Sequence, residues 1–260
     1  MNLIVCVKQV FDPETPAASF KIDPEKKRAI PSKDRPMVIS PFDESAVEAA
    51  LKVKDAHAGS KVIVLSMGGE SSKEVIKHGL AMGGDEGVQL TDPLFDDSDS
   101  FATASILAGA IKKMGQFDII FCGRQDADWD AGQVGSGIAE LLGIPSVTAI
   151  KKIDVKDGKA VVERVLPDGY EVVEVSLPVL VTVSNEIGSP RYATLKGIMA
   201  AAKKKVTKWG SSDVPAPAAK NKMLKLFIPV HEAKCEFVAG ETPEEAGAKL
   251  AVRLREAKLF

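Results

Sequence analysis

The loop at residues 123–137, GRQDADWDAGQVGSG, combines residue types that could bind a charged ligand. An apolar run, FDIIFC, precedes it and a helix-like segment, IAELLG, follows it. Glycines between a strand and a helix let a phosphate approach the backbone, whereas carboxylates repel one. The loop holds both types, in this order: Asp126, Asp128, Asp130, Gly132, Gly135 and Gly137.

Standard ion and phosphate motifs do not fit this loop. An EF-hand needs glycine at its sixth position and glutamate at its twelfth, where this chain has Ala131 and Gly137. Calcium is therefore rejected. The glycine spacing also matches neither a Walker A loop nor a Rossmann fingerprint.

Two interpretations of the loop remain. In the first, backbone N–H groups at Gln133–Ser136 hold a phosphate at the start of a helix that Asp130 caps. Asp126 or Asp128 then accepts hydrogen bonds from ribose hydroxyls, and Arg124 balances the charge. In the second, the loop is a solvated acidic loop whose glycines allow close helix packing. Spacing alone does not choose between them.

Two other strand ends could border the same ligand. SPFDE precedes a helix in which Ser40 suits the N-cap and Pro41 the first position, and Phe42 could border an adenine ring. LSMGGESS offers two glycines and a second helix start, with Ser71 or Ser72 as its cap. Both segments are also ordinary helix starts.

Alternating elements position these loops. Buried β-branched runs alternate with helical patterns through the first 145 residues, which predicts a parallel sheet covered on both faces, an α/β doubly wound fold. Ligands in such folds bind at the carboxyl ends of the strands. The expected strands are LIVCVKQV, KVIVLSMGG, GVQLT and FDIIFCG, and the expected helices begin near residues 41, 72, 99 and 135.

The pattern changes after about residue 146. SVTAIKKIDVKDGKAVVERVL, GYEVVEVSL and PVLVTVSN read as strands joined by turns, which predicts an antiparallel addition to the sheet. TLKGIMAAAKKKV reads as a short helix, and KWGSSDVPAPAAKNK as an extended linker. The tail forms a helix with Thr242 as its cap. We therefore expect an α/β domain at 1–210 and an arm with a terminal helix at 211–260.

The segment SNEIGSPRYATLKGIMAAAKKK could dock a partner. Leu195 would be an apolar anchor and Lys203–Lys205 steering charges, although the same pattern also suits a solvated helix end. No catalytic constellation stands out, because no serine or cysteine carries a nucleophile motif and the aspartate spacing supports no acid–base pair. His57, His78 and His231 are expected to be solvated.

Composition limits the other classes of function. The net charge of −2 over 260 residues gives no reason to expect nucleic-acid or membrane binding. Cys6, Cys122 and Cys235 show no metal-binding or disulfide spacing, and the first two should be buried thiols. No apolar run approaches the length of a bilayer span. A strand almost at the first residue leaves no room for a leader, so we place the protein in a cytoplasm.

Five motifs in one order resemble the β subunit of electron transfer flavoproteins: NLIVCVKQVFD, SPFDESAVEAAL, AMGGDEG, GRQDADWDAGQVGSGIAELLGIP and PRYATLKGIMAAAKKK. The resemblance covers roughly residues 1–210 and continues weakly to the end. It implies a heterodimer in which an α subunit holds most of one FAD and this chain packs against it, with its C-terminal arm and helix on the α subunit. It also implies an electron carrier rather than an independent enzyme.

The resemblance further implies an adenine nucleotide in this subunit. In the ordinary branch of the family it is AMP; in the electron-bifurcating branch it is a second FAD, with NAD(H) beside it and ferredoxin as an acceptor. Electrons come from flavin dehydrogenases such as acyl-CoA dehydrogenases and pass to an acceptor, often a quinone oxidoreductase. A stand-alone nucleotide-binding regulator is the alternative from another class.

Carried over residue by residue, the resemblance assigns two sets of positions. The cofactor-binding set is Cys6, Ser40, Pro41, Phe42, Asp43, Met67, Gly123, Arg124, Gln125, Asp126, Asp128, Asp130, Ala131, Gly132, Gln133, Val134, Gly135 and Ser136. The partner-docking set is Arg191, Tyr192, Leu195, Ile198 and Met199.

Departures from the family pattern leave its branch open. Bifurcating members usually read AIDGDTAQVGP where this chain reads DADWDAGQVGS, so Ala131 lacks a hydroxyl, Trp129 replaces glycine and Ser136 replaces proline. Ser40 replaces an amide residue, and Phe11 stands where the bifurcating branch often has proline. GRQ and QVG still resemble that branch. Losing one hydroxyl contact costs about 1 kcal/mol, which is not enough to abolish binding.

Overall fold

The computed structural model describes residues 1–16, 19–32, 34–229 and 235–259, so His231 lies outside the described residues. The chain divides into two units, Met1–Lys225 and Leu226–Phe260. The Pro- and Ala-rich segment that composition assigned to an arm from residue 211 onward thus belongs to the first unit as far as Lys225. Backbone N–H groups of Lys220 and Asn221 bond the Asp99 carboxylate at 2.9 Å, which ties this segment to the unit.

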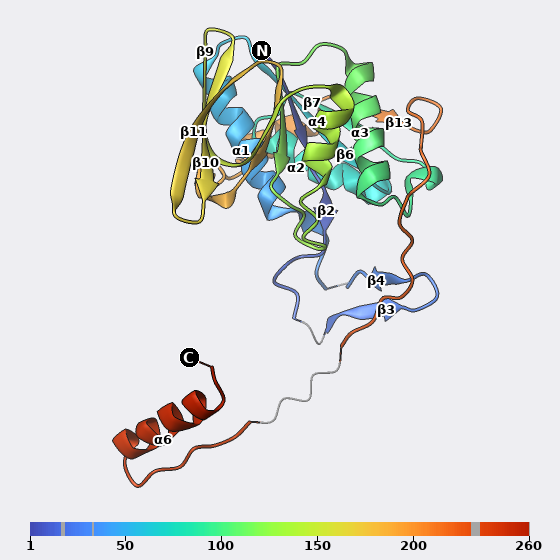
Figure 1. Ribbon diagram of the computed structural model, residues 1–260. Coiled ribbons are helices and arrows are strands. Elements are labelled where there is room, and N and C mark those ends of the chain that lie inside the picture. The colour runs from blue at the N-terminus through green and yellow to red at the C-terminus, as the bar shows by residue number, and fades with distance from the viewer. Residues whose placement is uncertain (17–18, 33, 230–234, 260) are drawn as a thin grey trace. The chain divides into compact units, whose positions relative to one another are not determined.

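A nine-stranded sheet organises the first unit, with the strand order β11-β10-β9-β12-β8-β1-β6-β7-β13 (Figure 1). Its central strands are parallel, as the alternating pattern predicted. They are apolar along their length because helices cover both of their faces. These strands are β1 (Asn2–Cys6), β6 (Lys61–Met67), β7 (Glu86–Leu90), β8 (Ile119–Gly123) and β12 (Val179–Val183).

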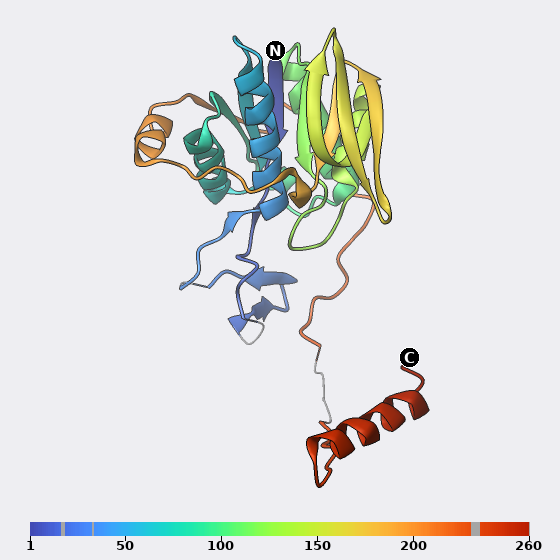
Figure 2. The ribbon, with the colours of Figure 1, turned by 90° about the vertical axis from the view of Figure 1, so that its left-hand side faces the viewer.

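Four helices cover the sheet in two layers. α1 (Pro41–Ala56) and α2 (Lys73–Met82) share one apolar cluster with alternate residues of the strands. α3 (Ser100–Met114) and α4 (Val134–Leu142) share a second cluster with the other residues of the same strands. Figure 2 shows α1 running alongside β1. The predicted α/β doubly wound fold is confirmed.

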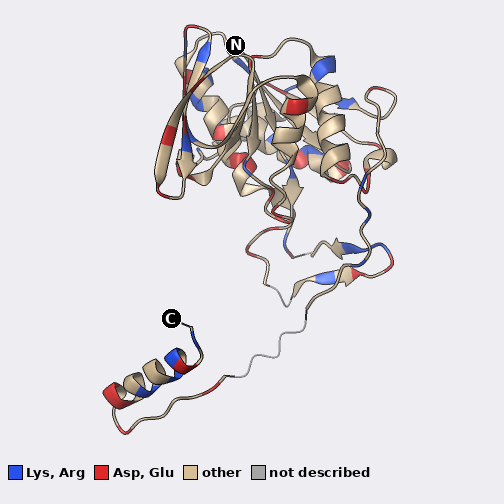
Figure 3. Cartoon of the chain, viewed as in Figure 1, with Lys and Arg blue, Asp and Glu red and all other residues tan. Residues whose placement is uncertain are grey.

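The antiparallel addition is smaller than the sequence indicated. β9 (Ser146–Lys156), β10 (Lys159–Leu166) and β11 (Gly169–Ser176) do form antiparallel pairs. However, β12 pairs in parallel with both β8 and β9, so its assignment to the antiparallel group was wrong. After the excursion through β10 and β11 the chain returns and inserts β12 between β8 and β9. Figure 3 shows charged side chains of both signs on the antiparallel strands. Opposite charges on neighbouring strands form ion pairs, as in Arg164–Glu171.

Several short strands were missed by sequence reasoning. β13 (Val206–Trp209) extends the sheet in parallel beside β7, within a stretch that composition assigned partly to a linker. The run LIVCVKQV is not one strand, because the chain leaves the main sheet after Cys6 and forms β2 (Gln9–Val10) with β5 (Val38–Ile39). Between these two lies the hairpin of β3 (Lys21–Asp23) and β4 (Arg28–Ile30).

Further helical segments complete the two units. α5 (Leu195–Ala201) contacts α2, and the 3-10 turns lie at Glu70–Ser72, Pro93–Phe95 and Asn185–Ile187. In the second unit, α6 (Pro243–Glu256) begins as predicted, with the Thr242 hydroxyl accepting from the Glu245 N–H. Over the described ranges, no helix is long and apolar enough to cross a membrane.

The strand order places the reversal of the sheet between β1 and β8. From β1 the chain adds β6 and then β7 on one side, and it crosses back through α3 to add β8 on the other side of β1. The connections that leave the carboxyl ends of β1 and β8 therefore diverge. In open α/β sheets this divergence opens the crevice in which ligands bind.

Candidate functional site

Asp43 joins the two strand ends at the reversal. Its side chain is buried at the first turn of α1, and its two oxygens accept from the backbone N–H of Lys8 at 2.7 Å and of Gly123 at 3.0 Å. Burial raises the pKa of Asp43 to about 7, against the lowering effect of these two donors. Both oxygens thus hold the start of α1 against the ends of β1 and β8.

Gly123 allows this close approach. A Cβ at this position would lie 2.5 Å from Asp43 Oδ1 and 2.8 Å from the carbonyl carbon of Phe42. Gly135 has a similar constraint, because a Cβ there would lie 2.8 Å from the Thr182 methyl group. Packing between helices and strands therefore accounts for these two glycines.

Lys8 reduces the conflict between the aspartates and an anion. Its ammonium group lies 2.7 Å from Asp126 and 2.6 Å from Asp128, so it offsets one of the two negative charges. Asp126 also accepts from the Ala131 N–H at 2.7 Å, which folds the acidic loop back on itself. Lys8 immediately follows the β1 end of the crevice, yet sequence reasoning did not single it out.

The start of α4 has no side-chain cap, so the prediction that Asp130 caps this helix is wrong. Asp130 adopts a φ of 53° and accepts from the Gln125 amide at 2.8 Å, while the N-cap position is Gln133. Because the acidic loop bulges here, the N-cap of the helix lies three residues later than a cap at Asp130 would require. The first N–H groups of α4, from Val134 onward, have no acceptor within the helix.

Arg124 and Phe42 form a stacked pair at the same edge. The guanidinium carbon lies 5.0 Å from the centre of the Phe42 ring, a cation–π distance. Arg124 Nη1 lies 3.5 Å from the Ser184 hydroxyl, which also donates to Glu186. The pKa of Glu186 is lowered by the Ser184 hydroxyl and its own backbone N–H, and further by the positive charge of Arg124.

Unpartnered polar atoms gather at this edge of the sheet. Among the described residues, three buried side-chain atoms have no hydrogen-bond partner: Ser40 Oγ, Ser66 Oγ and Arg124 Nε. Ser40 precedes α1, Ser66 lies near the end of β6, and Arg124 follows β8. A buried polar atom without a partner costs about 1–3 kcal/mol, so its presence indicates a missing polar group. A polar ligand at the carboxyl edge fits these atoms.

The two core cysteines lie side by side at the ends of β1 and β8. Cys6 and Cys122 are both buried, as predicted. Contact with the Cys6 thiol and burial raise the pKa of Cys122 well above its ordinary value. Met67, at the end of β6, packs against the same apolar cluster. These three residues thus form an apolar wall on the α3–α4 side of the crevice.

The docking segment exposes apolar side chains on and beside α5. Tyr192 is 96% exposed and Leu195 75%, and Ile198 and Met199 are also exposed. Arg191 differs from them, because its guanidinium bonds Glu48 at 2.8 Å and Asp55 at 2.9 Å on α1, and these contacts raise its pKa. Four of the five predicted docking residues therefore face outward.

A separate hollow of about 650 Å³ lies against the C-terminal half of α1 and strands β9 and β10. Its acidic and basic side chains pair with one another, as in Lys152–Asp154 at 3.2 Å and Lys151–Glu163 at 3.5 Å. None of the predicted site residues lines it. The crevice at the reversal, with its unpaired polar atoms, is therefore the better candidate.

Comparisons with known proteins decide the family. A family described as "Electron transfer flavoprotein domain" matches residues 30–214. The electron transfer flavoprotein subunit beta of Thermoanaerobacterium thermosaccharolyticum is 44% identical, over 82% of this chain and 79% of the relative. The chain belongs to the β-subunit family of electron transfer flavoproteins. The caffeyl-CoA reductase-Etf complex subunit CarD of Acetobacterium woodii is 38% identical over 98% of both chains. The acryloyl-CoA reductase electron transfer subunit gamma of Anaerotignum propionicum is 41% identical, over 76% of this chain and 73% of the relative.

Within this electron transfer flavoprotein subunit, direct contacts join many of the predicted cofactor-binding residues. Direct contacts link Asp43 with Gly123, Phe42 with Arg124, Cys6 with Cys122, and Gln125 with Asp130. Besides Lys8, sequence reasoning missed Ser66 and the Ser184–Glu186 pair. Their only signal is position, since Ser66 lies near the end of a parallel strand and Ser184 directly follows one.

The close approach at Gly123 predicts a cost for any side chain there. Gly123→Ala should lower the free energy of unfolding by about 1–3 kcal/mol, because the new methyl group overlaps Asp43 and the Phe42 backbone. Urea denaturation of the purified chain measures this difference. Gly69→Ala is the matched control, since a Cβ at Gly69 meets nothing within 4 Å. Equal stability of the two variants would contradict the packing role of Gly123.

The raised pKa of Asp43 predicts a pH-dependent contribution to stability. A carboxyl whose pKa is raised on folding from 3.8 to about 7 stabilises the fold most below pH 3.8, and this stabilisation is lost as the pH rises through about 7. The stability of the wild type relative to Asp43→Asn should therefore fall by about 2–3 kcal/mol between pH 5 and pH 7.

Denaturant unfolding at each pH measures that difference. Asp157→Asn, at the exposed turn between β9 and β10, controls for the loss of a surface carboxylate. A difference that stays constant from pH 5 to pH 8 would show that Asp43 remains charged throughout, held by its two backbone donors.

Proposed function

We propose that this chain is the β subunit of a heterodimeric electron transfer flavoprotein, and that it holds an adenine nucleotide at the crevice between β1 and β8. The observation that carries the proposal is the cluster of unpartnered polar atoms at that edge, Ser40 Oγ, Ser66 Oγ and Arg124 Nε. It coincides with an uncapped helix start at α4, where a phosphate is favourable. Family membership supplies the functional context.

Particular residues would hold the nucleotide. The N–H groups at the start of α4, at Val134, Gly135 and Ser136, would receive phosphate oxygens. Lys8 reduces the repulsion that Asp126 and Asp128 would otherwise exert on them. The Phe42 ring and the Arg124 guanidinium offer flat faces for an aromatic base.

The contribution of Asp43 to this site is indirect. Its two oxygens are occupied by the N–H groups of Lys8 and Gly123, so it sets the spacing between the two walls of the crevice. Lys8 and Arg124 lie just after the strand ends that Asp43 fixes. Lys8 pairs with the two aspartates, and Arg124 stacks on Phe42. Asp43 thus acts on the nucleotide through the residues that it positions.

Electron transfer itself requires no acid or base from this chain. A bound FAD, shared with the α subunit, would supply the redox chemistry, namely the uptake and release of electrons. The residues of this chain would bind and orient the cofactor and exclude water from it. An electron carrier therefore suits a chain in which sequence reasoning found no catalytic constellation.

The partners follow from two exposed apolar regions. α5 and Tyr192 would dock a flavin dehydrogenase, and two of the related proteins are named with reductases of CoA thioesters, which favours an acyl-CoA dehydrogenase. The second unit exposes Phe237, Leu250, Val252 and Leu259, and the α subunit would cover them. A quinone oxidoreductase would accept the electrons.

An electron-bifurcating complex is the second candidate. The relative CarD is named as a subunit of a reductase–Etf complex, and it is similar to this chain over nearly its full length. In that case the nucleotide in this subunit would be a second FAD, with NAD(H) beside it and ferredoxin as an acceptor. Flavin content distinguishes the two candidates.

The nucleotide proposal predicts the cofactor content of the heterodimer. Acid denaturation of the purified complex should release one adenine nucleotide in addition to the FAD of the α subunit, quantified by chromatography. One FAD with one AMP indicates an ordinary carrier, and two FAD indicate a bifurcating complex. Release of a single FAD and no other adenine nucleotide would refute the site.

A matched pair of lysine variants sharpens this test. Lys8→Met leaves Asp126 and Asp128 without their cation and should weaken nucleotide binding by roughly fivefold to tenfold. Lys61→Met is the control, because Lys61 is similarly exposed, 41% against 38%, but pairs with Glu86 at the opposite edge of the sheet. Calorimetric titration of the stripped heterodimer with AMP or FAD gives both affinities.

The docking proposal predicts a selective effect at Leu195. Leu195→Ala should raise the KM for an acyl-CoA dehydrogenase that reduces the wild-type heterodimer by tenfold or more, because anchors of this kind contribute about 2 kcal/mol. Leu94→Ala is the control, since Leu94 is nearly as exposed, 67% against 75%, and lies elsewhere. An unchanged KM for Leu195→Ala would exclude docking through α5.

A further inference from the structure

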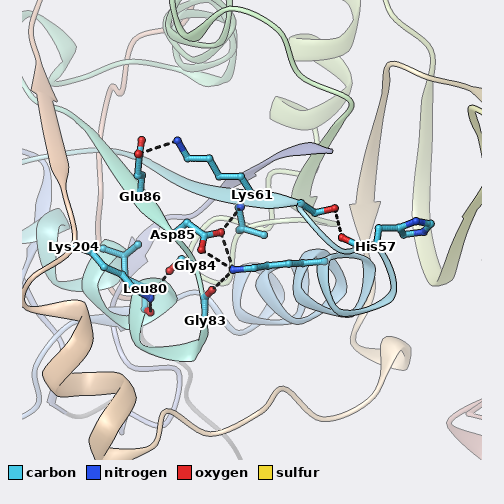
Figure 4. Close-up of polar contacts among 11 residues, drawn as sticks. His57, Lys61, Leu80, Gly83, Gly84, Asp85, Glu86 and Lys204 are labelled. Atoms are coloured by element: carbon cyan, nitrogen blue, oxygen red, sulfur yellow. Dashed lines mark hydrogen bonds and ion pairs between the residues drawn. The ribbon is translucent and has the colours of Figure 1, made fainter.

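The three lysines that follow α5 are not equivalent. Lys203 and Lys205 are exposed, whereas the ammonium group of Lys204 points back into the molecule and bonds the carbonyl oxygens of Leu80 at 2.9 Å and Gly84 at 2.5 Å (Figure 4). The interpretation of all three as steering charges therefore fails for Lys204. Its charge is used within the chain.

Lys204 binds where α2 ends. The last carbonyl groups of a helix have no N–H donor within the helix. They carry partial negative charge, which a cation stabilises. Lys54 from α1 reaches the same place, bonding the Gly83 carbonyl at 3.0 Å and Asp85 at 2.7 Å. Burial lowers the pKa of Lys204, and the negative charge of Asp85 partly offsets this.

α5 is attached to the rest of the unit at three points. Arg191, before the helix, is paired with Glu48 and Asp55 on α1. Within the helix, Gly197 lies so close to α2 that an added Cβ would overlap the Ala81 carbonyl oxygen. After the helix, Lys204 attaches the C-terminal end of α5 to the end of α2. Because a seven-residue helix is not stable by itself, these attachments must fix its position.

We propose that Lys204 is a positioning residue for partner docking: by bonding the end of α2 it holds α5 so that Leu195, Ile198 and Met199 present one fixed apolar surface to a flavin dehydrogenase. This inference rests on the docking function proposed for α5. A fixed surface binds more tightly than a mobile one, because less conformational entropy is lost on association.

Steering and positioning make different predictions for the lysine run. Steering charges act at long range, so removing any of the three would slow association to a similar extent, and salt would abolish the difference. Positioning depends on the contacts of one side chain. Removing Lys204 should then have a larger effect than removing its neighbours, and this effect should persist at high salt.

The experiment compares Lys204→Gln with Lys203→Gln and Lys205→Gln in the purified heterodimer. The readouts are KM and kcat with an acyl-CoA dehydrogenase that reduces the wild type, at low and high salt, and hydrogen exchange of the amides at 195–201. For Lys204→Gln we expect a KM raised roughly tenfold at both salt concentrations, a kcat changed less than twofold, and faster exchange. The two control variants should show normal exchange and only small, salt-sensitive changes in KM.

Two further variants guard against a general loss of stability. Lys204→Arg keeps a cation that reaches the same carbonyls and should restore KM to within about threefold of the wild type. Gly197→Ala pushes α5 away from Ala81 by a different route and should reproduce the high KM and fast exchange without altering charge.

The proposal is overturned if Lys204→Gln behaves like Lys203→Gln in both KM and exchange. It is also overturned if its KM effect disappears at high salt, since steering then explains it. If Leu195→Ala leaves KM unchanged, the docking function itself fails. In that case, normal exchange in Lys204→Gln overturns the positioning of α5 as well, and fast exchange confirms that Lys204 holds the helix.

Discussion

The carboxylate of Asp43 is the contact on which the candidate site depends. It lies on a helix, but it binds the backbone just beyond β1, at Lys8, and the backbone at the end of β8, at Gly123, which are 115 residues apart in the chain. β1 and β8 pair as far as Val5 and Phe121, but parallel strands share no hairpin, so no local connection joins the segments that continue beyond this ladder. A buried side chain with two backbone donors supplies that connection. The loops carrying Lys8 and Arg124 leave directly from these fixed points.

Charge in the site is balanced in pairs that use parts of the chain far apart in sequence. Lys8 forms ion pairs with two aspartates of the acidic loop. Arg124 stacks on Phe42 and faces the Ser184–Glu186 pair. Lys8 reduces the opposition between an acidic loop and an anionic ligand, because it offsets one of the two negative charges. The remaining polar capacity, at Ser40, Ser66 and the Arg124 Nε, is what a nucleotide would satisfy.

Sequence reasoning predicted the part of the fold that local patterns determine. Buried runs alternating with helical segments identified the parallel core, and the motifs identified the family, because both are properties of contiguous residues. The parallel direction of β12 could not be predicted, since a strand carries the same apolar pattern in either direction. β13 was missed because four residues between a lysine run and a Gly- and Pro-rich stretch give too short a signal.

The candidate site was predictable in its location but not in its contacts. Strand ends marked where the residues would gather, yet Lys8 and Asp126 are 118 positions apart and no periodicity relates them. The glycines of the loop illustrate the same limit. Their spacing suggested room for phosphate, whereas Gly123 and Gly135 are required by the close approach of Asp43 and Thr182. Only the packed structure separates these two causes.

The C-terminal unit has a different thermodynamic character from the rest of the chain. Thr242 caps the start of α6 and Pro243 occupies its first position. However, none of the residues of α6 is buried within this chain. A helix of 14 residues with no buried residue is marginal in water. If the proposed α subunit covers this helix, that contact supplies the free energy that keeps it ordered, and the helicity of this segment then reports whether the subunit has been assembled.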